Sequence, residues 1–371
     1  MAHVKRRRLS NGKAAYLVRY RDPAGRERSR QFTRKTDAEG FLHSTEVARR
    51  DGSWLDPARS KLRLRDWVTL WEPSTVNLSP STKARQDGIV EGHILPRFGD
   101  LPLARIENAA VQAWVAEMSA QGLAPSTVKK NYDVFAKCVQ AAVDDQRIHR
   151  NPARPVRLPR IGDQDEMRFL AVPEIDALAA VIDPAYRAWL LFMAYSGLRF
   201  GEGAALRWGR VNLLRGRAEV LESVVEVRGT LLFGPPKTRA GRRVVPLPQT
   251  VRTELAQLTP PHPDPDAFVF VSPKDDVLRV NNFRRRVWDP ALDAAGLQGV
   301  RIHDLRHTAI SLWIAVGLNP KEVSVRAGHS NVAFTLQRYG HLYPESEDQM
   351  AAALDTLIAS TRAASDGGAR R

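Results

Sequence analysis

The sequence is poor in cysteine and has no long hydrophobic run. Its single thiol, Cys138, can neither close an intramolecular disulfide nor build a thiolate zinc site, and the surrounding apolar pattern NYDVFAKCVQAAV predicts a small buried side chain. No apolar run approaches the roughly 20 residues that cross a bilayer. The basic start MAHVKRRRLS is not followed by the apolar core of a signal peptide. We therefore expect a cytoplasmic protein with no membrane partner.

Acidic residues are also in deficit. The chain of 371 residues has 56 lysines and arginines against 41 aspartates and glutamates, a formal net charge of +15. Such an excess favours a polyanionic partner, which is DNA, RNA or an acidic membrane surface, although a merely soluble basic protein has the same signature. Composition alone names no reaction.

Periodicity changes along the chain and predicts a multidomain α+β protein. We expect a small N-terminal unit at 1–60, a helical domain at 61–158, a linker at 159–167, a mixed domain at 168–360 and a disordered tail at 361–371. The linker belongs to NPARPVRLPRIGDQDEMRFL, which has prolines but no apolar period.

The first sixty residues predict a three-stranded sheet backed by one helix. AAYLVRYRD alternates apolar and polar residues, the turn signal Asp22-Pro23-Ala24-Gly25 and strand-like RERSRQF follow, and a third strand is expected between Val4 and Leu9. Arginines on such strands either enter a DNA groove or form an ordinary solvated face. The candidates are Arg19, Arg21, Arg26, Arg28 and Arg30.

Residues 61–158 predict a compact bundle of four helices. Apolar residues recur at helical spacing in LRDWVTLW, AVQAWVAEM and VKKNYDVFAKCVQAAV, and Pro80 and Pro125 lie beside helix starts. Basic residues after two of these starts are either phosphate contacts or surface charge. They are Lys83, Arg85, Lys129 and Lys130.

The segment 168–360 predicts a mainly helical domain with a small antiparallel sheet. AYRAWLLFMAYSGLR is a strongly apolar helix, and RAEVLESVVEVRGTLLFG and RRVVPLP are β-rich. Further helices are expected at about 249–258, 281–295, 303–317, 319–327 and 331–337, with a tail helix near 346–359. The apolar stripe of that tail packs either on a neighbouring protomer or on its own domain.

Several short motifs in this domain carry candidate chemistry. HDLRHT places His303 and Arg306 on one helix face, where both can donate hydrogen bonds to a phosphate. SGLRFGE ends the apolar helix with Arg199, three residues before Glu202, and an arginine there is costly to bury unless it meets an anion. GPPKTRAGRR, RAGHSN and LQRYGHLYP add further candidates: Lys237 on a turn, His329 and Tyr339.

Taken in order, these motifs resemble the catalytic set of the tyrosine recombinases. The matching residues are Arg199, Lys237, His303, Arg306, His329 and Tyr339, and the best match is to phage-type integrases. The resemblance is strong over about residues 168–345, where it implies the DNA breaking-rejoining fold. It also implies that the helical domain is the SAM-like core-binding domain and that the N-terminal sheet binds arm-type sites.

The resemblance implies a reaction with no metal or cofactor. Tyr339 would attack a phosphodiester and leave a 3′-phosphotyrosine bond, while Arg199, Arg306 and the two histidines stabilise the extra negative charge. By resemblance, His303 is the expected base, Lys237 the general acid and Glu202 a residue that orients Arg199 or a histidine. The stored bond energy would later let another strand's 5′-hydroxyl attack.

The implied partners are double-stranded DNA and other copies of the chain. A homotetramer would exchange strands through a Holliday junction and integrate a phage or mobile-element genome. A host DNA-bending protein and an excision directionality factor are the expected accessory partners.

Alternatives stay open at this point. Tyr343 competes with Tyr339 as nucleophile, and the lysine role could shift within a loop that also holds Arg239, Arg242 and Arg243. A zinc site of His303, His329 and His341 is disfavoured by the surrounding arginines, and His307 is expected to pack against another helix.

Two further points bear on the reaction. Gly201 and Gly203 weaken the helix after Arg199, so its local geometry is open. The rival functions are a type IB topoisomerase-like enzyme and a non-catalytic DNA-binding regulator.

Overall fold

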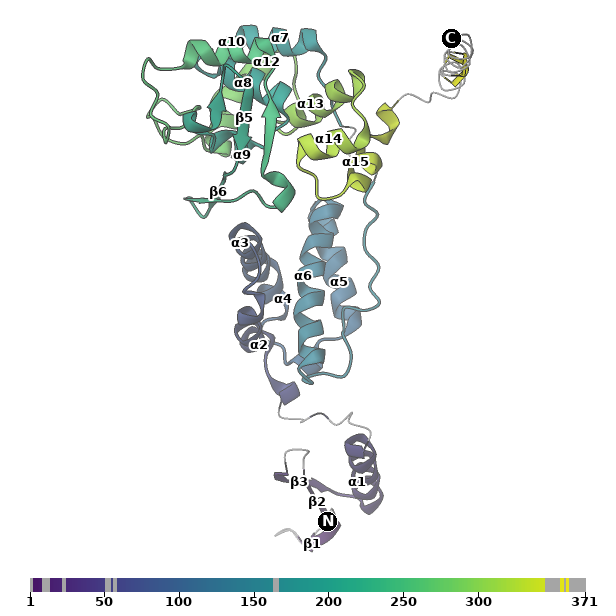
Figure 1. Ribbon diagram of the computed structural model, residues 1–371. Helices are drawn as coiled ribbons and strands as arrows, with labels where there is room; N and C mark the ends of the chain where they lie inside the picture. Colours follow the sequence, from purple (N-terminus) through teal and green to yellow (C-terminus); the bar gives the residue numbers. More distant parts are fainter. Residues whose placement is uncertain are drawn as a thin grey trace. The chain divides into compact units, whose positions relative to one another are not determined.

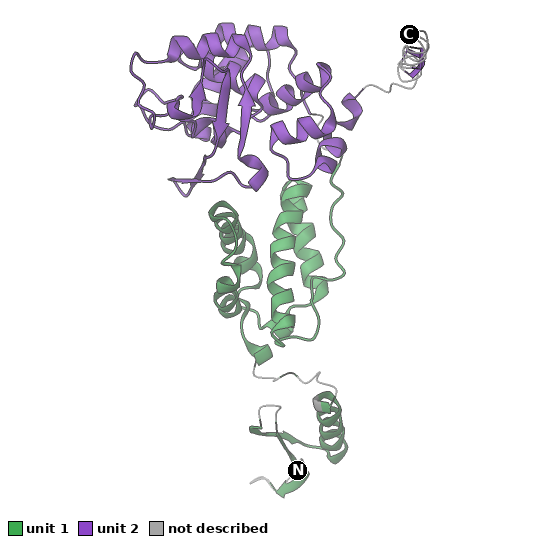
Figure 2. Cartoon of the chain, viewed as in Figure 1, with its two compact units in different colours: residues 1–164 green, residues 165–371 purple. Residues whose placement is uncertain are grey.

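The structure is a computed structural model that divides into two compact units, residues 1–164 and 165–371 (Figure 2). It describes residues 3–8, 14–21, 25–50, 55, 59–162, 167–343, 354–356 and 358–359. The expected tail at 361–371 therefore lies outside the described residues, as does most of the expected tail helix. Among the residues described, no helix is both long and apolar enough to cross a membrane.

The N-terminal part of the first unit is an antiparallel sheet in the order β1-β2-β3 with one helix beside it (Figure 1). Its elements are β1 (His3–Arg8), β2 (Ala14–Arg21), β3 (Glu27–Phe32) and α1 (Lys35–Arg50). Val18 and Tyr20 on β2 are buried with Ala38 of α1. The predicted three strands and helix are confirmed.

The register of this sheet separates its arginines onto two faces. Tyr20 lies opposite Arg28 and Val18 opposite Arg30, so these two arginines share the face that packs on α1, where Arg30 lies 4.9 Å from the Phe41 ring. Arg19 and Arg21 lie on the other face. That face also carries Lys5 and Arg7 of β1, which the sequence analysis did not select.

The second part of this unit is a helical bundle. Its elements are η1 (Arg59–Lys61), α2 (Leu64–Trp71), η2 (Glu72–Thr75), α3 (Pro80–Ile89), the π-helical η3 (Val90–Ile94), α4 (Leu95–Phe98), η4 (Leu103–Arg105), α5 (Asn108–Ala120) and α6 (Pro125–Asp144). Because α3, η3 and α4 follow one another without a break, they count as one helix. With α2, α5 and α6, the bundle then has the four predicted helices. Phe98 and Phe135 stack in its core at 4.9 Å, and Cys138 is buried as predicted.

The second unit is mainly helical with small antiparallel sheets, which confirms the predicted fold class. Its helices are α7 (Val172–Val181), η5 (Pro184–Tyr186), α8 (Arg187–Ser196), α9 (Phe200–Ala204), η6 (Trp208–Arg210), η7 (Arg239–Gly241), α10 (Gln249–Leu258), α11 (Val280–Phe283), the π-helical η8 (Arg284–Trp288), α12 (Asp289–Ala295), α13 (Asp304–Ala315), α14 (Pro320–Ala327), α15 (Val332–Tyr339) and η9 (Gly340–Leu342). Its strands are β4 (Val211–Asn212), β5 (Arg217–Val220), β6 (Ser223–Val227), β7 (Thr230–Gly234) and β8 (Arg243–Pro246).

Strands β5 and β8 are direct neighbours in the sheet β4-β5-β8, although β6 and β7 lie between them in the sequence. Residues 221–242 are therefore one excursion from the sheet, made of the β6–β7 hairpin and the loop that carries Lys237. The hairpin turns at Arg228 and Gly229, both of which have positive φ.

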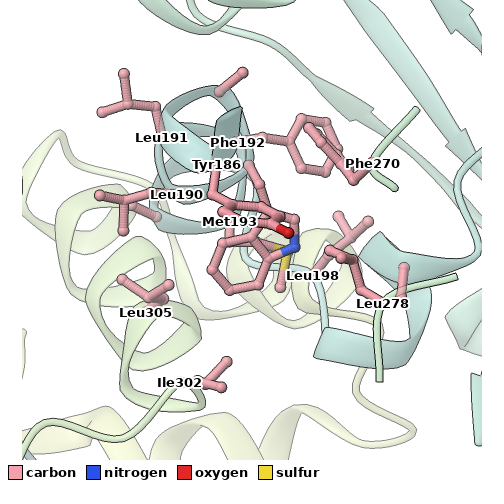
Figure 3. Packing of buried hydrophobic residues seen from close by; sticks show 14 of the residues in the cluster. Tyr186, Leu190, Leu191, Phe192, Met193, Leu198, Phe270, Leu278, Ile302 and Leu305 are labelled. Atoms are coloured by element: carbon pink, nitrogen blue, oxygen red, sulfur yellow. The ribbon is translucent and has the colours of Figure 1, made fainter. Parts of the chain in front are cut away.

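The core of the second unit surrounds α8. Leu190, Phe192 and Met193 of this helix pack against Phe270, Leu278 and Leu305 from other elements (Figure 3). The helix ends at Gly197, whose φ of +64° is left-handed and whose position leaves no room for a Cβ beside Trp313. This glycine turns the chain toward Arg199.

Candidate active site

Arg306 is a buried residue of α13 that joins the ends of two other helices. Its guanidinium donates to the Gly197 carbonyl at 2.7 Å and to the Ala327 carbonyl at 2.6 Å. These carbonyls close α8 and α14, where the helix dipole favours a cation. Burial, together with repulsion from Arg199 and Arg243, lowers the pKa of Arg306 to about 9. The local excess of positive charge is suited to an anion.

Arg199 begins α9 and is held by the carboxylate of Glu202. Its guanidinium donates to Glu202 Oε1 at 2.8 Å, and its backbone N–H donates to Oε2 at 3.1 Å. Although burial raises the pKa of Glu202, the cations of Arg243 and Arg199 lower it further, so the net direction is downward. Glu202 therefore stays ionised, while the Arg199 side chain remains partly exposed.

Two glycines after Arg199, Gly201 and Gly203, allow other elements to pack closely against α9. A Cβ on Gly201 would lie 2.2 Å from the Val224 carbonyl of β6, and one on Gly203 would lie 2.6 Å from Met193 Sδ. The glycines therefore do not disrupt α9. They let β6 and α8 pack closely against it, which fixes the helix that carries Glu202.

Arg243 is a buried cation of the site that the sequence analysis did not single out. It donates to Glu202 Oε2 at 3.0 Å, to the Gly241 carbonyl at 2.9 Å and to the Arg326 carbonyl at 2.6 Å. Arg243 thus joins α9, the Lys237 loop and the last turn of α14. The alternation of RRVVPLP was the available signal, because it places Arg243, Val245 and Leu247 on the buried face of one strand.

Tyr339 lies at the end of α15 and is almost fully buried, with 1% of its surface exposed. Its hydroxyl is 2.6 Å from Nδ1 of His307, and its ring stacks with that of His329 at 6.4 Å between centroids. Burial raises the pKa of Tyr339 to about 12, although the cations of Arg306 and Arg338 oppose the shift. The hydroxyl is therefore protonated near neutral pH.

His307 was expected only to pack against another helix, and that expectation was incomplete. The ring does face α15, but its nitrogen meets the hydroxyl of Tyr339. The available signal was its position next to Arg306 in HDLRHT, one helical turn after His303.

His329 and His303 contact different members of this cluster, Tyr339 and His307 respectively. His329 follows Gly328, which ends α14 with a φ of +68°, and its Nδ1 is 2.8 Å from the Thr335 hydroxyl. His303 precedes α13 at an exposed position, with its ring 4.9 Å from that of His307.

All three imidazoles are neutral at neutral pH. Desolvation, followed by Arg306 and Arg199, lowers the pKa of His303 to about 4 and that of His329 to about 3. For His307, desolvation and the neighbouring His303 lower the pKa to about 4. Neutral imidazoles can each donate one hydrogen bond and accept another.

Lys237 is exposed on the loop between β7 and β8. No hydrogen bond or ion pair joins it to the other described candidates. The loop residues on either side of Lys237 are nevertheless tightly packed. A Cβ on Gly241 would lie 2.4 Å from Pro236, and a Cβ on Gly328 would lie 3.0 Å from the Ala240 carbonyl. Of the neighbouring arginines, Arg239 and Arg242 are exposed and Arg243 is buried.

The remaining alternatives are also located. The Tyr343 hydroxyl is buried without a hydrogen-bond partner, four residues beyond Tyr339. Among the described residues there is no group of three His, Cys, Asp or Glu side chains arranged for a metal ion, including the set with His341.

The candidate DNA contacts of the helical bundle are only partly available. Lys83 pairs with Asp87 at 2.6 Å and Lys129 with Asp133 at 2.7 Å, each one helical turn away. Arg85 and Lys130 are exposed on the same two helices.

Two family models match the chain. Residues 168–346 match the phage integrase family, and residues 63–119 match the phage integrase N-terminal SAM-like domain. The integrase of Mycobacterium phage D29 is 26% identical over 321 residues, which cover 81% of this chain and 82% of that protein. The ICEBs1 integrase of Bacillus subtilis is 25% identical over 76% of this chain and 80% of that protein.

Solved structures share the fold. The Tn1549 transposon integrase, in complex with a circular intermediate DNA, aligns with a TM-score of 0.66 at 18% identity over 80% of this chain and 99% of that chain. The lambda integrase tetramer bound to a Holliday junction aligns with a TM-score of 0.56 at 15% identity over 92% of this chain and 95% of that chain.

Proposed function

The chain belongs to the phage integrase family and is a tyrosine-type site-specific recombinase, and from that premise we propose that Tyr339 cuts and rejoins DNA at this cluster. The observation that carries the proposal is the burial of Tyr339 against His307 and His329, where its hydroxyl meets the residue that follows the buried Arg306 in α13. A nucleophile next to an excess of arginine charge matches a reaction on an anionic phosphodiester.

The arginines bind the phosphate in this mechanism. Arg199 presents a partly exposed guanidinium that Glu202 holds in place, and Arg306 is fixed by two carbonyls. Because both are already ordered, they stabilise the extra charge on the nonbridging oxygens without reorganising during the reaction. The neutral His303 and His329 donate hydrogen bonds to the same oxygens.

The covalent step exchanges one phosphodiester for another. The Tyr339 oxygen gives up its proton to a neighbouring base as it bonds to phosphorus, the bond to the 5′ oxygen breaks, and Lys237 protonates the leaving oxygen. The 3′-phosphotyrosine bond conserves the energy of the broken linkage. Attack by a 5′-hydroxyl from another strand then reverses the step and joins the new strands.

The rest of the chain selects and holds DNA. The open face of the N-terminal sheet, with Lys5, Arg7, Arg19 and Arg21, binds arm-type sites. The helical bundle binds core sites, with Arg85 and Lys130 as the exposed candidates for phosphate contact and Lys83 and Lys129 as weaker ones. We keep the predicted domain limits of 1–60, 61–158 and 168–360 as part of this proposal.

The full reaction requires four copies of the chain and two DNA duplexes. Each copy supplies one Tyr339, and the strands exchange in sequence through a Holliday junction. The reaction integrates a phage or mobile-element genome in the cytoplasm of its host, with a DNA-bending protein as helper and a directionality factor for excision.

A covalent trap tests the chemistry. The protein is incubated, without ATP or metal, with a nicked duplex that carries a candidate attachment site, and the adduct is located by denaturing gel and peptide mass spectrometry. We expect a 3′-linked adduct on Tyr339 that Tyr339→Phe abolishes and the matched control Tyr343→Phe retains. An adduct on Tyr343 would exclude the assigned nucleophile.

The same assay addresses the rival functions. A site that the protein binds without forming any adduct would support a non-catalytic regulator. Relaxation of supercoiled DNA that needs no attachment site would support a type IB topoisomerase-like enzyme.

A further inference from the structure

The hydroxyl of Tyr339 meets an imidazole that does not belong to the set of six catalytic residues. Nδ1 of His307 lies 2.6 Å from the Tyr339 oxygen, a short and direct hydrogen bond between two buried side chains. The two residues come from different helices, α13 and α15, and are 32 positions apart in the sequence. The contact is therefore a product of helix packing.

The other two imidazoles of the cluster are engaged differently. Nδ1 of His329 is bonded to the Thr335 hydroxyl, and its ring lies parallel to the Tyr339 ring at 6.4 Å. The His303 ring makes a T-shaped contact with that of His307, and His303 is exposed, where it can reach a phosphate. Of the three, His307 is the one placed to exchange a proton with the nucleophile.

The direction of the hydrogen bond depends on the imidazole tautomer. With the proton on Nε2, Nδ1 accepts and the phenol donates its O–H to His307, which is the arrangement that proton transfer from Tyr339 requires. With the pKa of Tyr339 at about 12 and that of His307 at about 4, the proton stays on the tyrosine in the free protein. The nucleophile is thus neutral in the free protein.

Bond formation changes this balance. As the phenol oxygen bonds to phosphorus, it becomes an ester oxygen and loses its affinity for the proton, which must then move to a base within reach. Nδ1 of His307 is already at hydrogen-bond distance. The transfer needs no movement of either side chain.

We propose that His307 is a catalytic residue, the base that takes the Tyr339 proton as the tyrosine oxygen bonds to phosphorus and returns it when the DNA is rejoined. The inference rests on the proposed function. In cleavage, one proton passes from Tyr339 to His307, another passes from Lys237 to the 5′ oxygen, and the oxygen–phosphorus bonds exchange without any co-reactant. His303 then serves as a phosphate ligand and not as the base.

The test measures single-turnover cleavage of the nicked duplex by the full chain between about pH 6 and pH 9. His307→Ala is expected to cleave roughly 10²- to 10⁴-fold more slowly, the usual contribution of a general base. Its rate should rise about tenfold per pH unit, because the phenol must then ionise into solvent. Added imidazole should restore part of the rate by entering the vacated space.

Two further variants separate proton transfer from positioning. His307→Asn keeps a hydrogen-bond acceptor but cannot carry the proton, so it should recover thermal stability without recovering cleavage. His341→Ala removes an exposed histidine and should cleave normally. DNA binding, measured by gel shift, should be the same for all of these variants.

Several results would overturn the proposal. They are full activity in His307→Ala, recovery of cleavage in His307→Asn, or the steep pH dependence and imidazole rescue appearing in His303→Ala instead. Failure of the proposed function is distinct from these, because the unaltered chain would then form no adduct at Tyr339.

Discussion

The N-terminal sheet and the second unit, residues 165–371, which we propose as the catalytic unit, use arginine in different ways. On β2, the Arg19 side chain is 50% exposed and reaches Glu27 at 3.4 Å. In the catalytic unit, the Arg243 side chain is 4% exposed and donates to three acceptors on three segments. An exposed pair contributes about 0–1 kcal/mol, whereas breaking a buried one costs about 3–5 kcal/mol.

The difference separates affinity from catalysis. Exposed arginines attract DNA from a distance and are screened by salt. Buried arginines whose positions are fixed by carbonyls and Glu202 can stabilise a transition state, because they do not reorganise. Removing an exposed arginine should therefore lower DNA affinity, whereas removing a buried one should lower the cleavage rate and the stability.

Among the arginine variants, the largest expected effect comes from Arg306→Ala. The phosphate loses a fixed donor, which should slow cleavage by about 10²–10³. The buried carbonyls of Gly197 and Ala327 lose their partner, at about 1–3 kcal/mol each. Adduct formation and urea unfolding measure the two effects. Arg306→Lys should not restore them, since lysine cannot bridge both carbonyls, and full recovery would contradict a role for the planar group.

A smaller effect is expected from Arg243→Gln. This change leaves Glu202 and the Arg326 carbonyl without their buried donor and should lower the free energy of unfolding by about 3 kcal/mol. Cleavage should fall as well, because the Lys237 loop is no longer tied to α9. The matched control, Arg242→Gln, removes the same charge from the exposed neighbour and should stay within about 0.5 kcal/mol. An equal decrease in the free energy of unfolding in both variants would contradict the different roles assigned to buried and exposed arginines.

Acid should destabilise the catalytic unit before the N-terminal sheet. The pKa values of His307 and His329, about 4 and about 3, lie below the ordinary value of 6.5. The unfolded chain therefore binds more protons below about pH 6.5, and the free energy of unfolding falls as the pH drops toward about 4. Limited proteolysis of the full chain at about pH 7.5 and about pH 5 measures which unit opens first. His329→Gln should reduce this pH dependence, and an unchanged dependence would argue against the histidines.

The smallest structural effect is expected on the sheet. Arg19→Ala with Arg21→Ala should change the free energy of unfolding by less than about 0.5 kcal/mol. Binding to arm-type DNA should weaken, and the slope of log affinity against log salt should decrease by about 0.9 for each lost phosphate contact. Binding measured over a salt series tests this. Arg30→Ala is the control from the opposite face, and an equal loss there would contradict the division of the faces.

The sequence was sufficient to predict most of the helices and strands and to identify the family. The apolar period of AYRAWLLFMAYSGLR and the alternation in AAYLVRYRD predicted α8 and β2, because burial of one face imposes these periods. It did not predict how the sheet arginines divide, since their faces depend on strand register. The sequence also predicted that Gly201 and Gly203 weaken the helix after Arg199. In the structure, their lack of side chains lets β6 and α8 pack closely against that helix.

What the sequence determined by itself is the set of reactive residue types and their order, because each motif is local and needs only its neighbours to be read. What only the tertiary structure decided is which groups touch. His307 meets Tyr339, and Arg243 meets Glu202, across 32 and 41 positions of chain. Such contacts depend on how helices and strands pack, and packing is set by the whole core and not by a motif.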